Sequence, residues 1–222
     1  MSDRPFGRTN RVLPRVWLKL IPSNDSDDRE AIAAKLGSSL AVLDVSTAPA
    51  LWGHELKTAE QALMMVRGGV AVENATDSTH AADLMQAEIL QQVCSLQRGK
   101  IDIFAFRLRR ALEEFQLGGA LDALQMARDD GLVSYVALVP EAPDLTVLSQ
   151  WQFNDAFEGV LFPAGYAEAD RAALTDMAKE RRVGVVDEVM SLEGDVHLRG
   201  DAVLVPVGSV SDLESVEGQA VL

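Results

Sequence analysis

The segment from residue 100 to residue 139 restricts the fold of this chain more than any other. Short apolar strands are expected at residues 101–106 and 133–139. A helix is expected between them, from Gly118-Gly119 to Gly131, because a glycine just past the last turn can adopt the left-handed conformation that ends a helix. Two strands connected through a helix run parallel in one sheet, so this segment predicts a βαβ unit.

The same alternation of strands and helices continues along the rest of the chain. Further strands are expected at residues 16–21, 40–45, 70–74, 159–162, 183–186 and 202–207. Helices are expected from apolar residues at spacings of three and four, as from Leu56 to Val66. They cover residues 26–37, 54–66, 78–96 and 144–156, the row of Ala169, Ala173 and Met177, and a last helix from Ser211.

Eight strands that alternate with helices predict an α/β fold. This is the pattern of a (β/α)8 TIM barrel, but a doubly wound open sheet shows the same alternation, so periodicity alone leaves the two close. No GxGxxG sequence follows the first strand, which counts against a dinucleotide-binding sheet. Residues 191–201, between the seventh and eighth strands, include two glycines and are too few for an outer helix. The barrel is therefore expected to be trimmed, with this helix missing and an apolar flank left for a protein partner or a second copy.

The composition limits the class of protein. A chain of 222 residues with 48% hydrophobic content can form one sizeable core, so we expect one barrel domain over residues 15–222 after a flexible, solvated arm over residues 1–14. A formal net charge of −14 counts against nucleic-acid and anionic-membrane partners, which are themselves negative. Cys94 is the only cysteine, and no apolar segment follows the arginines of the arm, so a cytoplasmic protein is expected.

Several segments resemble the aldo-keto reductase family in their order and spacing. They are Thr47 to Gly53, Ile101 to Phe104, Ala120 to Leu124, Gly131 to Val136, Lys179 to Val186 and Val205 to Gly208. The resemblance implies a (β/α)8 barrel. In an intact member it also implies reduction of a carbonyl compound by NADPH, with a tyrosine as proton donor, a lysine and an aspartate that lower the pKa of the tyrosine, and a histidine that orients the substrate.

The four catalytic positions implied by the resemblance are changed in this chain. The tyrosine position is Trp52, whose indole N–H cannot act as an acid near neutral pH. The aspartate position falls on Ser46 or Thr47, the lysine position on Asn74 and the histidine position on Arg107. The resemblance therefore implies a family member that has lost the reaction, with no intact catalytic residue.

The positions that hold the cofactor in the family are changed as well. The Ser-Asn pair is Val139-Pro140, the glutamine is Leu161, and the aromatic residue that stacks on the nicotinamide is Glu188. Where relatives have basic residues for the phosphate, this chain has Asp212, Glu214 and Glu217. Carboxylates repel a phosphate, so we expect no NADPH binding and no other cofactor.

Charged residues near the carboxyl ends of the strands are the remaining candidates for a ligand site, since the site of a barrel lies there. The ligand-binding candidates are Glu73, Arg107, Glu141, Asp187 and Glu188. Arg107 either binds a small anionic ligand, with Glu73 as a base, or pairs with Glu73 or Asp44 as a structural plug. We favour the plug because paired charges are commonly structural.

The remaining chemistry-bearing residues predict no further site. His54, His80 and His197 lack the spacing of a metal site, so no metal is expected. Trp52 is expected to pack in the core instead of stacking on a ligand, and Cys94 to be a small packing residue.

Three functions stay open from the sequence. The favoured one is a pseudoenzyme that binds a protein partner or a ligand, as the modifier subunit of glutamate–cysteine ligase does on the same fold. The second is an enzyme of another class that uses Arg107 and barrel-mouth carboxylates on a small anionic substrate. The third is a divergent NAD(P)H-dependent oxidoreductase with its donor elsewhere; Tyr166 is the tyrosine expected nearest the mouth, and Tyr135 starts a strand at the opposite end.

Overall fold

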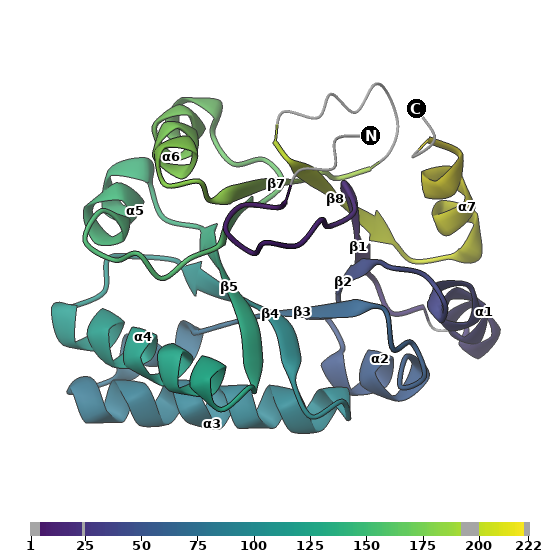
Figure 1. The fold of residues 1–222 in the computed structure, drawn as a ribbon, viewed down its shortest axis with the longest axis horizontal. Helices are drawn as coiled ribbons and strands as arrows, with labels where there is room; N and C mark the ends of the chain where they lie inside the picture. The colour runs from purple at the N-terminus through teal and green to yellow at the C-terminus, as the bar shows by residue number, and fades with distance from the viewer. Residues whose placement is uncertain (1–4, 24, 192–199, 220–222) are drawn as a thin grey trace.

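A computed structural model of the chain describes residues 5–23, 25–191 and 200–219 (Figure 1). Its parallel strands close into a barrel in chain order. They are β1 (Val16–Leu20), β2 (Val42–Asp44), β3 (Leu63–Gly68), β4 (Ile101–Leu108), β5 (Val133–Pro140), β6 (Gly159–Phe162), β7 (Gly184–Glu188) and β8 (Ala202–Val207). The helices are α1 (Ser26–Leu36), α2 (Pro49–Glu55), α3 (Ser78–Leu96), α4 (Glu114–Asp129), α5 (Asp144–Trp151), α6 (Glu168–Glu180) and α7 (Val210–Gln219), with a 3₁₀ helix η1 (Val70–Asn74).

The predicted (β/α)8 barrel is confirmed, and β4 shows why the strands are apolar throughout. Phe104 and Phe106 pack outward against the helices, while Ile103 and Ala105 belong to the cluster inside the barrel. A strand covered on both sides needs apolar residues at consecutive positions. The predicted βαβ unit is β4, α4 and β5, with Ile103 opposite Tyr135 in the parallel pairing.

The segment between β2 and α3 differs from the prediction. The helix expected at residues 54–66 is shorter and earlier, as α2, and residues 63–68 form β3. The strand expected at residues 70–74 is the 3₁₀ helix η1. Leu63 and the three apolar residues after it are all buried. Consecutive buried residues fit a strand that is covered on both faces, and this burial decides the structure in spite of the helical spacing.

Helix α4 begins earlier than predicted, and the two glycines lie inside it. The side chain of Glu113 and that of Gln116 form a capping box that satisfies amide groups of the first turn. Gly119 is buried against α3, where a Cβ atom would lie 2.2 Å from the carbonyl oxygen of Ser78. Gly119 therefore serves the contact between two helices and does not start one.

The connection from β7 to β8 contains no helix among the described residues on either side of the gap at 192–199, as the trimmed barrel predicts. The outward-facing residues of β8 (Val203, Val205 and Val207) are nevertheless buried. The expected apolar flank is thus not exposed on β8. In α6 the buried residues are Arg171, Leu174 and Ala178, so the inner row lies beside the one we predicted.

Residues 5–14 cross the amino-terminal end of the barrel (Figure 1). Phe6 packs against Trp17 with ring centroids 5.0 Å apart, and the indole N–H of Trp17 donates to the carbonyl oxygen of Pro14 at 2.9 Å. A Cβ atom on Gly184 would lie 2.4 Å from the Phe6 ring, so the glycine makes room for it. Phe6 and Leu13 are buried, so this part of the arm is packed and not solvated.

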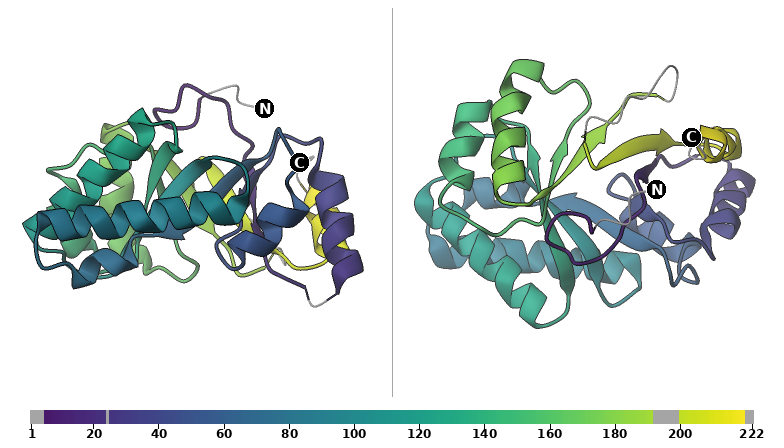
Figure 2. Two further views of the ribbon diagram at one scale, coloured as in Figure 1. Left: turned by 90° about the horizontal axis from the view of Figure 1, so that it is seen from below. Right: turned by 45° about the horizontal axis from the view of Figure 1, so that its top comes forward.

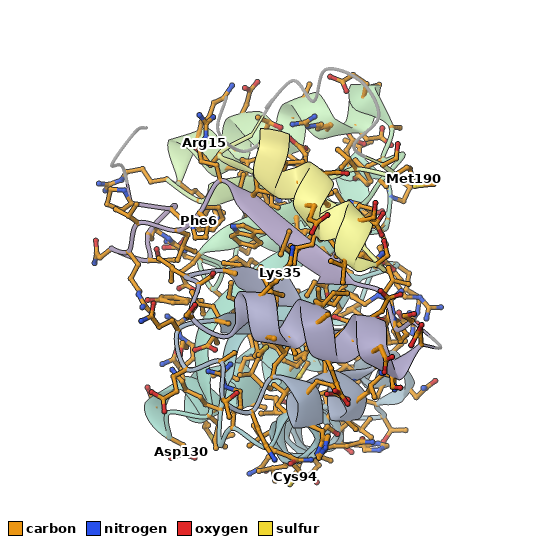
Figure 3. The ribbon with its side chains drawn as sticks, turned by 90° about the vertical axis from the view of Figure 1, so that its right-hand side faces the viewer. Phe6, Arg15, Lys35, Cys94, Asp130 and Met190 are labelled. Carbon is orange, nitrogen blue, oxygen red and sulfur yellow. The ribbon has the colours of Figure 1, made fainter. Side chains whose placement is uncertain are left out.

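The outer helices follow one another around the barrel (Figure 2). Helices α3 and α4 pack together on one side, and α7 lies beside α1 on another (Figure 3). Lys35 of α1 and Glu214 of α7 form an ion pair of 2.7 Å there. Within the described residues, no helix is both long enough and apolar enough to cross a membrane.

Candidate functional site

Alternate residues of each strand point toward the barrel axis, and the last inward positions of four strands are charged. Lower inward positions are apolar, for example Trp17 on β1 and Met65 on β3. At the carboxyl-terminal ends of β1, β2, β3 and β7, the next inward residue of each strand is charged. These residues are Lys19, Asp44, Arg67 and Glu188. A barrel site lies at this end of the strands.

These four side chains form one ion-pair network across the mouth of the barrel, which we call the mouth network. The Nε and Nη2 atoms of Arg67 lie 2.8 Å and 2.6 Å from Oδ2 of Asp44. Its Nη1 atom lies 2.9 Å from Oε2 of Glu188, whose Oε1 is 2.6 Å from Nζ of Lys19. The network ties together the ends of β1, β2, β3 and β7 with two positive and two negative charges.

The mouth network is largely shielded from water and supported by Ser46. The side chains of Asp44, Glu188 and Arg67 are 1%, 8% and 12% exposed. Oδ1 of Asp44 accepts hydrogen bonds from the Ser46 hydroxyl and from its amide N–H at 3.0 Å. Oγ of Ser46 in turn accepts the amide N–H of Arg67 at 2.8 Å. The carboxylate at the end of β2 is therefore satisfied by the chain itself.

The charges of Arg67 and Glu188 in the mouth network are fixed near neutral pH. Burial alone would lower the pKa of Arg67, but Asp44 and Glu188 outweigh it and the pKa is raised. Burial alone would raise the pKa of Glu188, but Arg67 and Lys19 outweigh it and the pKa is lowered. Both groups stay ionised near pH 7, so neither offers the exchangeable proton that acid–base catalysis needs.

The structural plug that we predicted exists in the mouth, but around a different arginine. Arg67 pairs with Asp44, whereas the prediction used Arg107. Arg67 was missed because residues 54–66 were interpreted as a helix, which left no strand end at position 67. Asn74, which the resemblance matches to the catalytic lysine of the family, is exposed at the end of η1. The apolar run from Ala62 to Val66 was the signal for the strand that Arg67 ends.

The five predicted ligand-binding candidates fall into separate ion pairs. Arg107 holds Glu141 with two hydrogen bonds, of 2.9 Å and 3.0 Å, and is 36% exposed. Asp187 pairs with Arg171 at 2.8 Å, Glu188 belongs to the mouth network, and Glu73 lies 3.7 Å from Arg109 and 3.5 Å from Arg110. The structure does not bring the five into one site.

The aromatic residues suggested for the mouth serve the packing instead. Trp52 is fully buried in the hydrophobic core from its place on α2, as the packing interpretation predicted. The Tyr166 hydroxyl donates to the carbonyl oxygen of Ala142 at 3.0 Å. Burial, together with Asp170 and Asp144, raises the pKa of Tyr166 to about 12. This tyrosine is a poorer proton donor than an ordinary one.

The amino end of α7 holds an anion that belongs to the chain. Oδ2 of Asp212 accepts the amide N–H groups of Gly208 and Ser209, both at 2.9 Å. The first amides of a helix are the donors that bind anions in many proteins. Here a carboxylate of the helix already accepts the amides of the two residues that immediately precede it.

The other reactive side chains do not gather into a site. Among the described residues, no three metal-binding side chains come together, and His197 lies outside those residues. His80 contacts Thr76 within its own turn. Cys94 is exposed on α3, so its interpretation as a packing residue is wrong (Figure 3).

Comparisons with known proteins place the fold. Neither the protein-family models nor the curated proteins give a match to the sequence. An aldo-keto reductase from Bacillus halodurans superposes with a TM-score of 0.75 and 13% identity, covering 100% of this chain and 91% of that one. A protein of Pseudomonas aeruginosa assigned to the same reductases gives 0.72 and 16%, covering 99% and 95%. A reductase from a Medee basin deep-sea metagenome library gives 0.61 and 12%, covering 83% and 67%. At these identities the likeness establishes the fold: the chain has the (β/α)8 barrel of the aldo-keto reductases.

Proposed function

We propose that this protein is an aldo-keto-reductase-like pseudoenzyme, which does not reduce carbonyl compounds with NADPH and acts as a binding, regulatory or structural protein. The mouth network is the observation that carries the proposal. Arg67 stands at the end of β3 with its charge shared between Asp44 and Glu188. An arginine held this way keeps its proton, so it cannot take part in proton transfer.

The tyrosines support the same proposal. Tyr135 lies at the amino-terminal end of the barrel, where its hydroxyl points to the carbonyl oxygen of Thr9 at 3.4 Å. Tyr166 donates to a backbone carbonyl and has a raised pKa. Neither offers a free phenol to a carbonyl group in the mouth.

The surroundings of the expected cofactor positions support the absence of NADPH. Glu188 stands at the position implied for the stacking aromatic residue and is held in the mouth network. Asp212 accepts the amides of Gly208 and Ser209, just before α7, and a phosphate placed there would meet its carboxylate. The negative charges of the phosphate and of the Asp212 carboxylate would repel one another strongly.

An assay of NADPH oxidation with a panel of aromatic and aliphatic aldehydes tests the proposal. The rate is expected to equal that of the reaction without protein, while an active aldo-keto reductase in the same mixture shows turnover. Saturable oxidation of NADPH would contradict the proposal. In that case Tyr166→Phe decides the donor, because loss of turnover in this variant alone would assign the role to Tyr166.

The protein is further proposed to work in the cytoplasm. Cys94 is exposed on α3 and forms no disulfide, which suits a reducing compartment. Fractionation of cells that express the full chain checks this, with recovery in the soluble cytoplasmic fraction as the expected result.

A further inference from the structure

One flank of the barrel exposes several large apolar side chains. Phe115 and Met126 on α4 are 37% and 51% exposed, and Leu145 on α5 and Phe153 just after it are 75% and 82% exposed. The other exposed large apolar residues of the described chain are scattered; they are Val12, Leu40, Leu90 and Met190. Half of these eight exposed large apolar side chains therefore lie on α4, α5 and the turn after α5, which we call the α4–α5 flank.

The two helices of this flank are neighbours in the fold (Figure 1). The amide N–H of Leu112, just before α4, donates to Oε1 of Gln150 on α5 at 3.3 Å, and Nε2 of Gln150 donates back to the Leu112 carbonyl oxygen at 2.5 Å. Phe115 and Met126 are about three helical turns apart, so they point to the same side of α4. Large apolar side chains that are exposed on one flank are typical of interaction sites.

The segment of the chain that contains this flank carries half of the net charge. Residues 113–156 contain eight carboxylate side chains and one basic residue, Arg128, so their formal charge is 1 − 8 = −7, against −14 for the chain. Arg128 is paired with Glu158 at 2.9 Å. Glu141 and Asp155 are balanced by arginines outside the segment. The other six form no ion pair in the described structure; they are Glu113, Glu114, Asp122, Asp129, Asp130 and Asp144.

The backbone of α4 is open on its outer side. Gly118 lies inside the helix, where glycine costs about 1 kcal/mol relative to alanine. Unlike Gly119, it meets no neighbour, since a Cβ atom there would have nothing within 4 Å. A partner can therefore approach the helix closely beside Phe115.

We infer that the α4–α5 flank binds a basic amphipathic segment of a partner protein, in which lysine or arginine alternates with large apolar residues. The apolar side chains supply the buried contact and the six unpaired carboxylates supply the charge complementarity. A second copy placed on the flank by two-fold symmetry would bring the same carboxylates face to face, so charge disfavours self-association. The inference rests on the proposed function as a binding protein and names the class of partner.

A synthetic amphipathic helix of leucine and lysine, about five turns long and labelled with fluorescein, is the probe. Fluorescence anisotropy of this probe with the full chain is expected to show saturable binding that weakens as salt is raised. The double variant Leu145→Ser/Phe153→Ser is expected to weaken binding at least about tenfold, because few contacts carry most of the affinity of an interface. The matched control Val12→Ser/Leu40→Ser removes two exposed apolar side chains elsewhere and is expected to bind normally.

Other outcomes overturn the inference. Absence of binding, or equal affinity of the flank and control variants, would show that the probe has no site on α4 and α5. Light scattering is expected to find a monomer, and a dimer that the flank variant dissociates would assign the surface to a second copy. None of these results depends on NADPH turnover, so the partner surface and the pseudoenzyme proposal fail separately.

Discussion

The two ends of the barrel are closed by different physical means. At the amino-terminal end Phe6, Leu13 and Trp17 fill the opening with apolar side chains. At the carboxyl-terminal end the mouth network closes it with charges, two of which are Arg67 and Glu188. Apolar contact is non-directional and depends on shape, whereas a buried ion pair depends on each partner keeping its charge.

This difference has a consequence for function, because the carboxyl-terminal end is where barrel enzymes place their sites. In this protein the inward side chains at that end bind one another. Polar groups that satisfy each other have little left for a ligand. The closure at the mouth is therefore the observation on which the proposed loss of reductase activity depends.

The largest loss of stability is expected when apolar packing is removed at the amino-terminal end of the barrel. Trp17→Ala removes a buried indole that packs on Phe6, and should lower the free energy of unfolding by about 3–5 kcal/mol. Urea denaturation measures this loss. The loss should be the same at pH 5 and pH 7, since no charge is involved; a strongly pH-dependent loss would mean that the two ends are coupled.

Breaking the charged end should cost somewhat less. Arg67→Met leaves Asp44 without its cation and Glu188 with Lys19 alone, and should lower the free energy of unfolding by about 2–4 kcal/mol at pH 7. Arg107→Met is the matched control, because its partner Glu141 is partly in water; a loss of about 1 kcal/mol or less is expected there. Equal losses in the two variants would show that burial of the network contributes nothing.

The charged end should also be the acid-sensitive one. The folded-state pKa of Glu188 is lowered, so its contribution to stability is complete above the unfolded pKa of about 4.3 and is lost as pH falls through the folded value. Glu188→Gln should cost about 1–2 kcal/mol at pH 7, and the difference from the native protein should shrink below pH 4. Unfolding curves over this pH range check it. If the free energies of unfolding of Glu188→Gln and the native protein differed by the same amount at all pH values, the lowered pKa of Glu188 would be contradicted.

A smaller effect of opposite sign is expected at Glu88, beside the mouth on α3. Burial raises the pKa of Glu88, and the Gly69 amide and Arg107 offset this only in part. Its ionised form therefore destabilises the fold as pH rises above the unfolded pKa. Glu88→Gln, which can still accept the Gly69 N–H, should raise the free energy of unfolding at pH 7 by under about 1 kcal/mol and leave it unchanged at pH 4. Destabilisation at pH 7 would show that the carboxylate charge itself is needed.

The barrel could be predicted from sequence because most of its strands carry unambiguous signals. The apolar runs at β4, β5 and β8 follow from local physics, and so does the end of α4 before Gly131. Segment 54–74 failed because its apolar residues fit both a helical spacing and a buried strand. Only the pairing of β3 between β2 and β4 decides between the two, and that contact is distant in sequence.

The site was predicted less well, for a related reason. The sequence pointed to a charged plug, but the members of the plug come from four strands. Because the third strand was predicted at residues 70–74 and lies at residues 63–68, the residue predicted at its end was Asn74 and not Arg67. The partners of Arg107 and Asp187 could not be found either, because side-chain pairing across loops leaves no periodic pattern. The sequence predicts a solvated arm because arginines separate its few apolar residues, whereas Phe6 and Leu13 are buried in the structure.

Direct binding of NADPH, measured by isothermal titration calorimetry on the full chain, tests the central claim that the charged end of this barrel is closed. A parallel thermal unfolding series adds a second readout, since a ligand that binds only the native state raises its apparent stability. The account predicts no heat of binding and no thermal shift at millimolar NADPH. Saturable binding with a matching shift would contradict it, because the cofactor would then reach the mouth despite the ion pairs of Arg67 and the carboxylate of Asp212.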